Sequence, residues 1–256
     1  MSRLAAYLGP EITLGEFMTG PPNSLYHQAR QSREADFSTF NADGFGIGWY
    51  HDLLPQRYIM TAPIWHDPNL PALADSLSSD LWLGVVRSDT GSATPFNAQP
   101  HVSESLLFMH DGFVEDFNRN LKPACLSYLS ADIASEVHGN SASEYLFALL
   151  RQRILDPDEL SVEHALADIL SNLQVSLRDI TSLLNIVLSD GQRLIAARHA
   201  TNRHSPSLYY STENPNFPGG QLIASEPLDE TGSWEPVLEH HILILENGHA
   251  PKVSHL

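Results

Sequence analysis

Short apolar runs bounded by turn residues recur along this 256-residue chain, and they constrain its fold more than any other feature. They lie at residues 4–8, 45–50, 58–62, 81–86, 106–109, 183–188, 194–197, 208–210, 222–224 and 242–245. Runs of this length are typical of β-strands. The pairs Asp190-Gly191 and Asn247-Gly248 follow two of them and are typical of tight hairpin turns. The spacing therefore favours antiparallel hairpins.

Helical periodicity is concentrated in the middle of the chain. Apolar side chains recur every three or four positions over residues 143–155 and again over 161–177. A third helix is expected to begin at Asp67-Pro68, with Asp67 as its cap and Pro68 in its first turn. Strands at both ends therefore flank central helices. This order predicts an α+β fold in which two antiparallel sheets pack face to face under outer helices, as one domain over residues 1–256.

The net charge of the chain limits the kinds of molecule that it can bind. Lys and Arg total 14 and Asp and Glu total 31, which gives a formal net charge of −17. Such a field repels phosphate backbones and anionic lipid headgroups, so we expect no nucleic-acid and no membrane partner. The single cysteine, Cys125, has no partner for an internal disulfide, and the N-terminus does not resemble a signal peptide. A soluble cytoplasmic protein is expected.

Residues 41–50 carry the densest local signal, in which Gly44, Gly46 and Gly48 alternate with bulky residues after an Asn/Asp turn. Glycine at every second position clears one face of a strand, so that backbone or ligand can approach closely. A tight hairpin under a core aromatic is the favoured interpretation, and a ligand-binding strand is the alternative.

Two more segments place polar groups where apolar runs end. Arg87 follows run 81–86, where a guanidinium can bind a substrate carboxylate through two parallel hydrogen bonds or pair with a structural Asp. Gly112 follows run 106–109, and its backbone N–H is placed to form half of an oxyanion hole.

Taken in order, these motifs resemble those of a known family. The matching residues are 4–10, 41–50, 62–65 with Asp67-Pro68, Val86-Arg87 with Thr90, Asn97 with Pro100, His110 with Gly112, Ser143-Glu144, 208–210, and 224–228 followed by Trp234. The chain resembles the class II, N-terminal-nucleophile (Ntn) glutamine amidotransferases. Within them it is most similar to the branch that contains the ergothioneine-pathway γ-glutamyl-hercynylcysteine sulfoxide amidohydrolase. The resemblance spans nearly the whole chain and implies a four-layer αββα sandwich of the Ntn-hydrolase type, without a metal or organic cofactor.

The resemblance also implies a catalytic role for residue 2. In the family this residue is a cysteine that becomes N-terminal when the initiator methionine is removed, and its own α-amine acts as the base. An α-amine suits this task because its reference pKa of about 7.7–8.0 lies near neutrality. Here the residue is Ser2, which is small enough for Met1 to be removed. A hydroxyl beside an α-amine is a nucleophile of the same kind as an N-terminal threonine.

Other positions depart from the family pattern. Its Asn-Gly oxyanion pair appears here as Asp111-Gly112, in which Gly112 keeps its N–H but Asp111 could donate only as a protonated carboxyl. The Asp that holds the substrate α-ammonium is replaced by Ala142, and the His of an Asn-Ala-His-Pro pattern is replaced by Gln99.

Together these positions define a candidate site. The catalytic candidates are Ser2, Asp111 and Gly112, and the substrate-binding candidates are Arg87, Thr90, Asn97, Gln99, His110 and Ala142. The 13 histidines lack metal-motif spacing, so no metal site is predicted.

Two hypotheses remain open. In one, the protein is an amidohydrolase acting on a γ-glutamyl-type or related small-molecule amide of a biosynthetic pathway, with Ser2 as the nucleophile. In the other, it is a catalytically inactive pseudo-amidotransferase that binds a ligand or scaffolds a partner enzyme of the same pathway.

Overall fold

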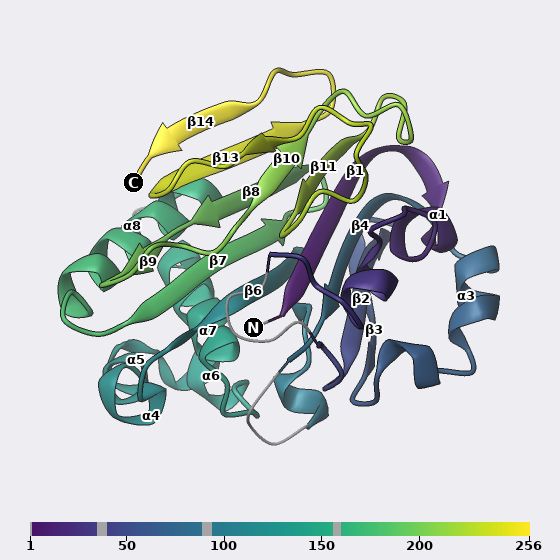
Figure 1. Cartoon of the computed structure of the whole chain (residues 1–256). Helices are drawn as coiled ribbons and strands as arrows, with labels where there is room; N and C mark the ends of the chain where they lie inside the picture. The colour runs from purple at the N-terminus through teal and green to yellow at the C-terminus, as the bar shows by residue number, and fades with distance from the viewer. Residues whose placement is uncertain (1, 35–39, 89–93, 156–159) are drawn as a thin grey trace.

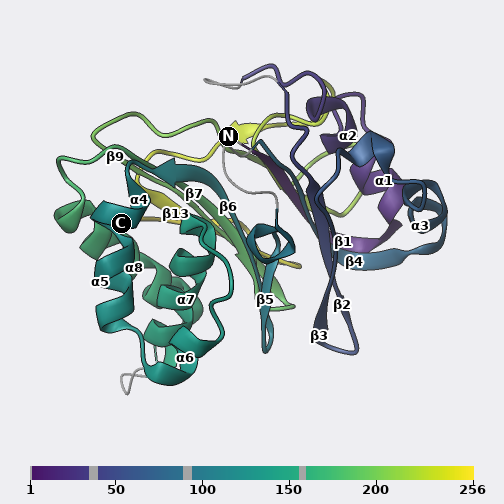
Figure 2. The same cartoon turned by 90° about the horizontal axis from the view of Figure 1, so that it is seen from below.

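The computed structural model describes residues 2–34, 40–88, 94–155 and 160–256. In these residues two antiparallel sheets of seven strands pack face to face, and helices cover the outer face of each sheet (Figure 1). The view from below shows the four layers side by side, with α1–α3 on one outer face and α5–α8 on the other (Figure 2). The predicted α+β sandwich of two antiparallel sheets is confirmed.

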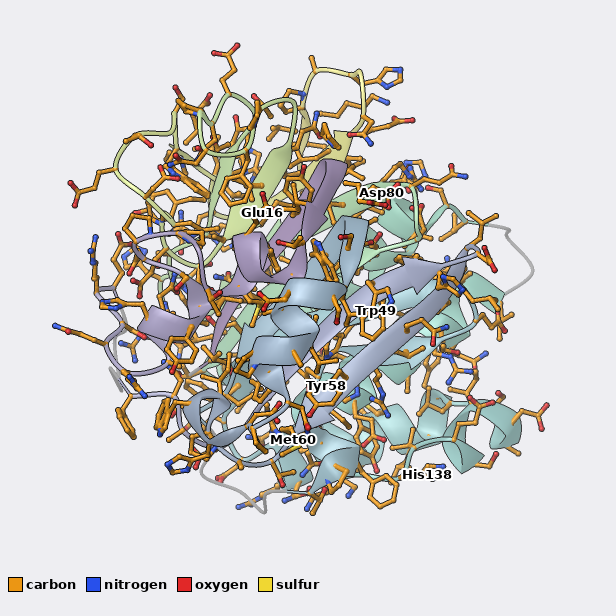
Figure 3. The ribbon with its side chains drawn as sticks, turned by 90° about the vertical axis from the view of Figure 1, so that its right-hand side faces the viewer. Glu16, Trp49, Tyr58, Met60, Asp80 and His138 are labelled. Carbon is orange, nitrogen blue, oxygen red and sulfur yellow. The ribbon has the colours of Figure 1, made fainter. Side chains whose placement is uncertain are left out.

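The first sheet contains the N-terminal strand at its centre. In spatial order its strands are β12 (Glu235–Pro236), β10 (Tyr209–Ser211), β11 (Gln221–Ala224), β1 (Arg3–Thr13), β4 (Ser78–Val86), β2 (Phe45–His51) and β3 (Leu54–Met60). Its outer face is covered by α1 (Leu14–Met18), α2 (Leu25–Gln28) and α3 (Leu70–Ser76). Short 3-10 turns occur at Ile64–His66 and Pro95–Asn97. On this side Trp49, Tyr58 and Met60 pack against the apolar side chains that lie between the first sheet and its helices (Figure 3).

The second sheet contains the strand that carries Gly112. In spatial order its strands are β14 (Lys252–His255), β13 (His241–Glu246), β8 (Arg193–Arg198), β7 (Ser182–Ser189), β6 (Leu106–Val114) and β5 (His101–Ser103), with β9 (Ala200–Thr201) paired to β7. Its helices are α4 (Phe117–Asn120), α5 (Lys122–Tyr128), α6 (Ala131–Ser135), α7 (Ala142–Leu155) and α8 (Val162–Ser176).

Side-chain alternation along the strands divides the core into layers. In β1, Leu4, Ala6 and Leu8 pack between the two sheets, whereas Ala5 and Tyr7 pack under the helices of the first sheet. A strand buried on both faces must be apolar at nearly every position, as residues 4–8 are. The central position of β1 therefore follows from its sequence.

The structure corrects three local predictions. Strand β3 ends at Met60, so the predicted run 58–62 starts too late and extends too far. The first helix of the middle region begins at Leu70 with Pro71 in its first turn, so Asp67-Pro68 lies before the helix. Gly112 lies inside β6, which continues to Val114, and so does not follow the end of a strand.

Candidate functional site

The start of β1 brings Ser2 to Arg87. The antiparallel pairing of β1 and β4 sets Arg3 opposite Val86, so the preceding residue, Ser2, lies next to Arg87 just beyond the end of β4. Ser2 is 9% exposed and Arg87 is 3% exposed. By strand alternation Ser2 falls on the same side as Leu4, which packs between the sheets. Two predicted site residues, far apart in sequence, therefore meet where the central strands β1 and β4 of the first sheet end.

The backbone around Arg87 is fixed on its other side. The Arg87 N–H donates to the Gly44 carbonyl at 2.9 Å, and the Arg87 carbonyl accepts the Asp43 N–H at 2.9 Å. The turn that precedes the glycine-rich strand β2 thus holds the end of β4. This places the predicted carboxylate-binding arginine on a rigid element.

Gly112 presents its backbone N–H on the free side of β6. It lies opposite Leu184 of β7, and the Leu184 N–H donates to the backbone carbonyl of His199, on the far side of β7, at 2.9 Å. Gly112 and Leu184 therefore form a non-hydrogen-bonded pair, and the Gly112 N–H faces away from β7. In the described residues β5 pairs with β6 only as far as Phe108. The geometry suits the predicted oxyanion donor.

A side chain larger than hydrogen does not fit at this position. A methyl group on Gly112 would overlap the Leu183 carbonyl oxygen and lie 2.8 Å from the His110 Nε2. Glycine is required here by packing, independently of any role in chemistry.

Gln99 occupies the free edge of β6 just before Gly112. Its Nε2 donates to the His110 carbonyl at 3.0 Å, and its Oε1 accepts the His110 N–H at 2.6 Å. The side-chain amide thus takes the place of a neighbouring strand. The Gln99 backbone carbonyl packs directly on Gly46 of β2, and Pro100 packs on Gly48. Both sheets therefore position the segment that contains Gln99.

The predicted close approach to the alternating glycines is thus made by the Gln99 backbone at Gly46 and by the Pro100 and Leu107 side chains at Gly48. Gly46 and Gly48 face residues 99–100 and Leu107 of the second sheet. The favoured hairpin interpretation of residues 41–50 is confirmed by the β2–β3 pairing.

His110 and His101 are buried neutral histidines. Burial lowers the pKa of His110, whose Nε2 lies 2.9 Å from the Leu183 carbonyl and therefore carries the proton. Burial, together with the charges of Arg57 and Arg87, lowers the pKa of His101 to about 3. The His101 Nε2 lies 3.0 Å from the Ser143 Oγ. A base with so low a pKa is poorly matched to proton transfer near neutral pH.

Asn97 and Ala142 lie around the start of α7. The Asn97 side chain donates to the Asn140 Oδ1 at 2.8 Å and accepts the Asn140 N–H at 2.9 Å, so it fixes the loop that leads into the helix. Ala142 is the first residue of α7 and packs against the core of the second sheet. Thr90 lies outside the described residues.

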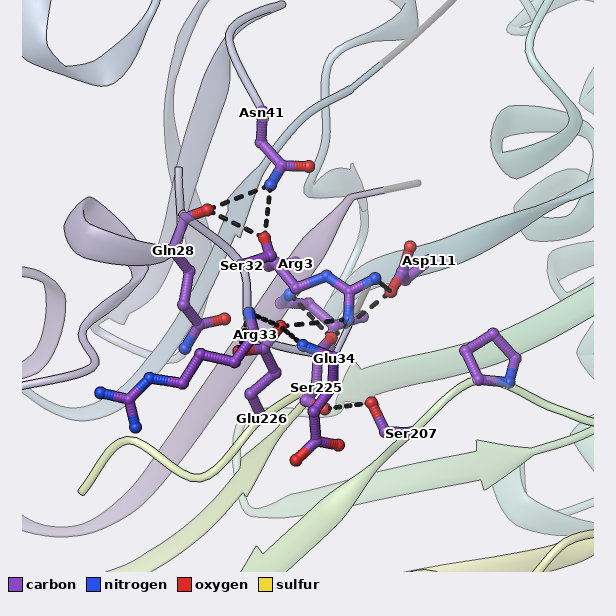
Figure 4. Close-up of polar contacts among 12 residues, drawn as sticks. Arg3, Gln28, Ser32, Arg33, Glu34, Asn41, Asp111, Ser207, Ser225 and Glu226 are labelled. Atoms are coloured by element: carbon purple, nitrogen blue, oxygen red, sulfur yellow. Dashed lines mark hydrogen bonds and ion pairs between the residues drawn. The ribbon is translucent and has the colours of Figure 1, made fainter. Parts of the chain in front are cut away.

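Asp111 contacts Arg3, which in turn contacts Glu226, and sequence reasoning selected neither Arg3 nor Glu226 as a site residue. Its Oδ2 lies 3.7 Å from the Arg3 Nη2, and the Arg3 Nη1 lies 3.6 Å from the Glu226 Oε1 (Figure 4). We name Arg3, Asp111 and Glu226 the Arg3 cluster. All three side chains are at most 1% exposed. A cation beside the apolar run 4–8 was the sequence signal that could have identified Arg3.

Glu226 also adjoins a surface cavity. A cavity of about 310 Å³ is lined by Glu226, Arg33, Glu34, Trp234 and their neighbours. A second, of about 720 Å³, shares Arg33 with it and extends toward Phe217. Ser2, Arg87 and Gly112 line neither cavity.

The described residues contain neither a metal-ligand cluster nor a membrane-spanning helix. Across residues 2–34, 40–88, 94–155 and 160–256, no three His, Cys, Asp or Glu side chains gather in an arrangement that could hold a metal ion. Over the same ranges, none of the helices has the length and apolar character needed to span a bilayer.

Comparison with known proteins identifies relatives with this architecture. No protein-family model matches the chain. A gamma-glutamyl-hercynylcysteine sulfoxide hydrolase of Mycobacterium tuberculosis is 29% identical over 245 residues, which cover 95% of this chain and 92% of the relative. A glutamine aminotransferase class-II domain protein from Silicibacter pomeroyi is 26% identical with a TM-score of 0.73, over 99% of this chain and 98% of its own.

A more distant structure shares the fold. The glutamine phosphoribosylpyrophosphate amidotransferase of Bacillus subtilis has a TM-score of 0.68 at 15% identity, and the match covers 99% of this chain and 49% of that one. The chain thus has the class II glutamine amidotransferase-like fold and is similar in sequence to γ-glutamyl-hercynylcysteine sulfoxide hydrolases.

Proposed function

We propose that this protein is an Ntn-type amidohydrolase that acts on a γ-glutamyl-type or related small-molecule amide, with Ser2 as the nucleophile. The observation that carries the proposal is the meeting of Ser2 and Arg87 at the ends of the central strands β1 and β4, with Arg3 reaching across to Asp111, the neighbour of Gly112. The relationship to γ-glutamyl-hercynylcysteine sulfoxide hydrolases supports the amide class of the substrate.

The proposed reaction uses only groups of this chain and water. After removal of Met1, the Ser2 Oγ attacks the amide carbonyl while the α-amine of Ser2 takes the hydroxyl proton. The Gly112 N–H donates to the developing oxyanion. The C–N bond then breaks, the α-amine returns the proton to the leaving amine, and water hydrolyses the Ser2 ester to regenerate the hydroxyl.

Substrate recognition is divided between a charged and an apolar position. Arg87, held at the end of β4, binds a carboxylate of the acyl group. Ala142 offers no carboxylate for an α-ammonium where the family resemblance implies one. We therefore expect the preferred acyl group to carry a carboxylate but to gain little from an α-ammonium at the position of Ala142.

The proposal is tested by mass and by turnover. Intact-mass spectrometry of the purified protein should show that Met1 is absent, because a retained Met1 blocks the α-amine. Incubation with γ-glutamyl and other carboxylate-bearing amides should then show release of the amine. Ser2→Ala should lower the turnover at least about 100-fold, since the nucleophile is lost, and Ser176→Ala on the far helix α8 serves as the matched control.

A retained Met1, or equal turnover by the wild type and Ser2→Ala, would remove the hydrolase proposal. The second candidate, a pseudo-amidotransferase that binds a ligand or a partner enzyme, is favoured by one observation: the residue at the family's side-chain oxyanion donor position is Asp111, a carboxylate beside Arg3. In that case calorimetry should detect binding of carboxylate-bearing amides without turnover, and Arg87→Met should abolish the binding.

A further inference from the structure

The Arg3 cluster joins four chain segments inside the protein. Arg3 begins β1, Asp111 lies in β6 of the other sheet, and Glu226 follows β11. The Glu226 carboxylate also accepts the backbone N–H groups of Arg33, at 2.9 Å, and Glu34, at 3.0 Å (Figure 4). The cluster thus connects the two sheets next to the N-terminus.

The two carboxylates of the cluster are not equivalent. Among residues 2–34, 40–88, 94–155 and 160–256, Glu226 has two backbone donors besides Arg3, whereas Asp111 accepts one hydrogen bond, from the Ser225 Oγ at 3.4 Å. The Asp111 Oδ1 has no hydrogen-bond partner in the described residues. A buried carboxylate with few donors depends on its counterion, because the charge is removed from water. Asp111 therefore relies on Arg3, and Arg3 is correspondingly held at Asp111.

Ser225 connects Asp111 to the next residue of β1 as well. The Leu4 N–H donates to the Ser225 Oγ at 3.1 Å, and the Ser225 N–H donates to the Leu4 carbonyl at 2.9 Å. Asp111 is thus linked to both residues that follow Ser2, to Arg3 by charge and to Leu4 through Ser225. Chain ends ordinarily fray unless they are tied down.

We infer that Asp111 is a positioning residue, which fixes the position of Ser2 at the start of β1 by anchoring Arg3 and Leu4. Its catalytic consequence rests on the proposed function. An asparagine at position 111 would keep the shape of the side chain but lose the charge that pairs with Arg3. It would gain an N–H donor, so the two roles of residue 111 predict opposite effects of the same substitution.

The first test measures anchoring without activity. Hydrogen exchange of the full-length protein, followed by mass spectrometry of a peptide that covers residues 2–8, should be faster in Asp111→Asn by about tenfold or more. Peptides from β13 should exchange as in the wild type. Asp168→Asn, which removes the partner of Arg153 at the surface, is the matched control and should leave both regions unchanged.

A second variant tests the same inference if Asp111→Asn does not fold. Ser225→Ala removes the hydroxyl between Leu4 and Asp111 and keeps all three charges, so it should speed exchange of residues 2–8 in the same direction but less. Wild-type exchange at residues 2–8 in folded Asp111→Asn, or in Ser225→Ala where Asp111→Asn does not fold, would overturn the inference.

The second test uses turnover, where the wild type shows Ser2-dependent hydrolysis. Displacement of the nucleophile in Asp111→Asn should lower kcat by about tenfold or more while KM changes little, since Arg87 is untouched. An unchanged or higher kcat would show that residue 111 acts as an oxyanion donor and would overturn the inference. Where the wild type shows no such hydrolysis, the proposed function fails, and the exchange measurement still decides whether Asp111 anchors β1.

Discussion

Two glycines illustrate how a single residue decides the geometry of the site. Gly46 allows the Gln99 carbonyl to lie against β2, and Gly112 allows the Leu183 carbonyl of β7 and the His110 ring to lie close to its own Cα. Both contacts involve backbone atoms, which cannot move aside as a flexible side chain can. The glycines therefore fix how closely the segment that carries Gln99 approaches β2 and how closely β6 approaches β7.

Alanine at either glycine should be strongly destabilising. The added methyl group would overlap a backbone carbonyl in Gly46→Ala and in Gly112→Ala, so the free energy of unfolding should fall by about 3 kcal/mol in each. Gly248→Ala is the control, because its methyl meets nothing within 4 Å. The control should cost about 1 kcal/mol from its left-handed backbone. Urea unfolding measures all three, and a loss at Gly46 no larger than at Gly248 would contradict the packing argument.

At the scale of elements, α7 links the apolar core between the second sheet and its helices to the site. Its buried face lies against the second sheet, and its first residues include Ala142 and Ser143, the partner of His101. The Ser141 Oγ accepts the Glu144 N–H at 3.3 Å and caps the helix start. The helix thus reaches the site by its N-terminal end, while its stability comes from the apolar side chains farther along.

Leu146→Ala should test this division. Leu146 is 2% exposed, so its truncation leaves a cavity and should lower the free energy of unfolding by about 2–5 kcal/mol. Leu155 ends the same helix at 60% exposed, and Leu155→Ala should change stability by no more than about 0.5 kcal/mol. Thermal and urea unfolding of the two variants give the comparison. Equal losses would mean that α7 is not anchored by its buried face.

At the scale of the whole molecule, buried neutral histidines predict sensitivity to acid. Burial is the main cause that lowers the pKa of His101 to about 3 and that of His199 to about 4. Unfolded histidine titrates near pH 6.5, so below that pH the unfolded chain binds more protons than the folded one. The stability that these groups contribute is present above pH about 6.5 and is lost as the pH falls toward the folded values.

Urea unfolding at pH 7.5, 6.0 and 5.0 should therefore show falling stability. Each such histidine should contribute up to about 1.4 kcal/mol per pH unit below pH 6.5. His199→Asn keeps a polar partner for the His240 Nδ1, which lies 2.9 Å from the His199 Nδ1. This variant should show a shallower dependence on pH, whatever its stability at pH 7.5. A slope equal to that of the wild type would contradict the assignment of His199 as buried and neutral.

Sequence patterns predicted most of the architecture because local physical rules govern it. Apolar runs such as 183–188 and the turn at Asp190-Gly191 specify strands and a hairpin within a few residues of each other, and the periodicity of 161–177 specifies α8. Local patterns define the ends of strands less sharply than their centres. The apolar run 106–109 predicts that Gly112 follows a strand, yet β6 runs through Gly112 because its pairing with β7 continues to Val114.

The sequence by itself determined the two-sheet sandwich, the apolar identity of β1 and the choice of Ser2, Arg87 and Gly112 as candidates. The tertiary structure alone decided that Arg3 pairs with both Asp111 and Glu226, and that the side chain of Gln99 serves as an edge partner of β6. These contacts join residues more than 100 positions apart or depend on which side of a strand is free. No local pattern encodes such information, because an ion pair buried between sheets exists only once both sheets have packed.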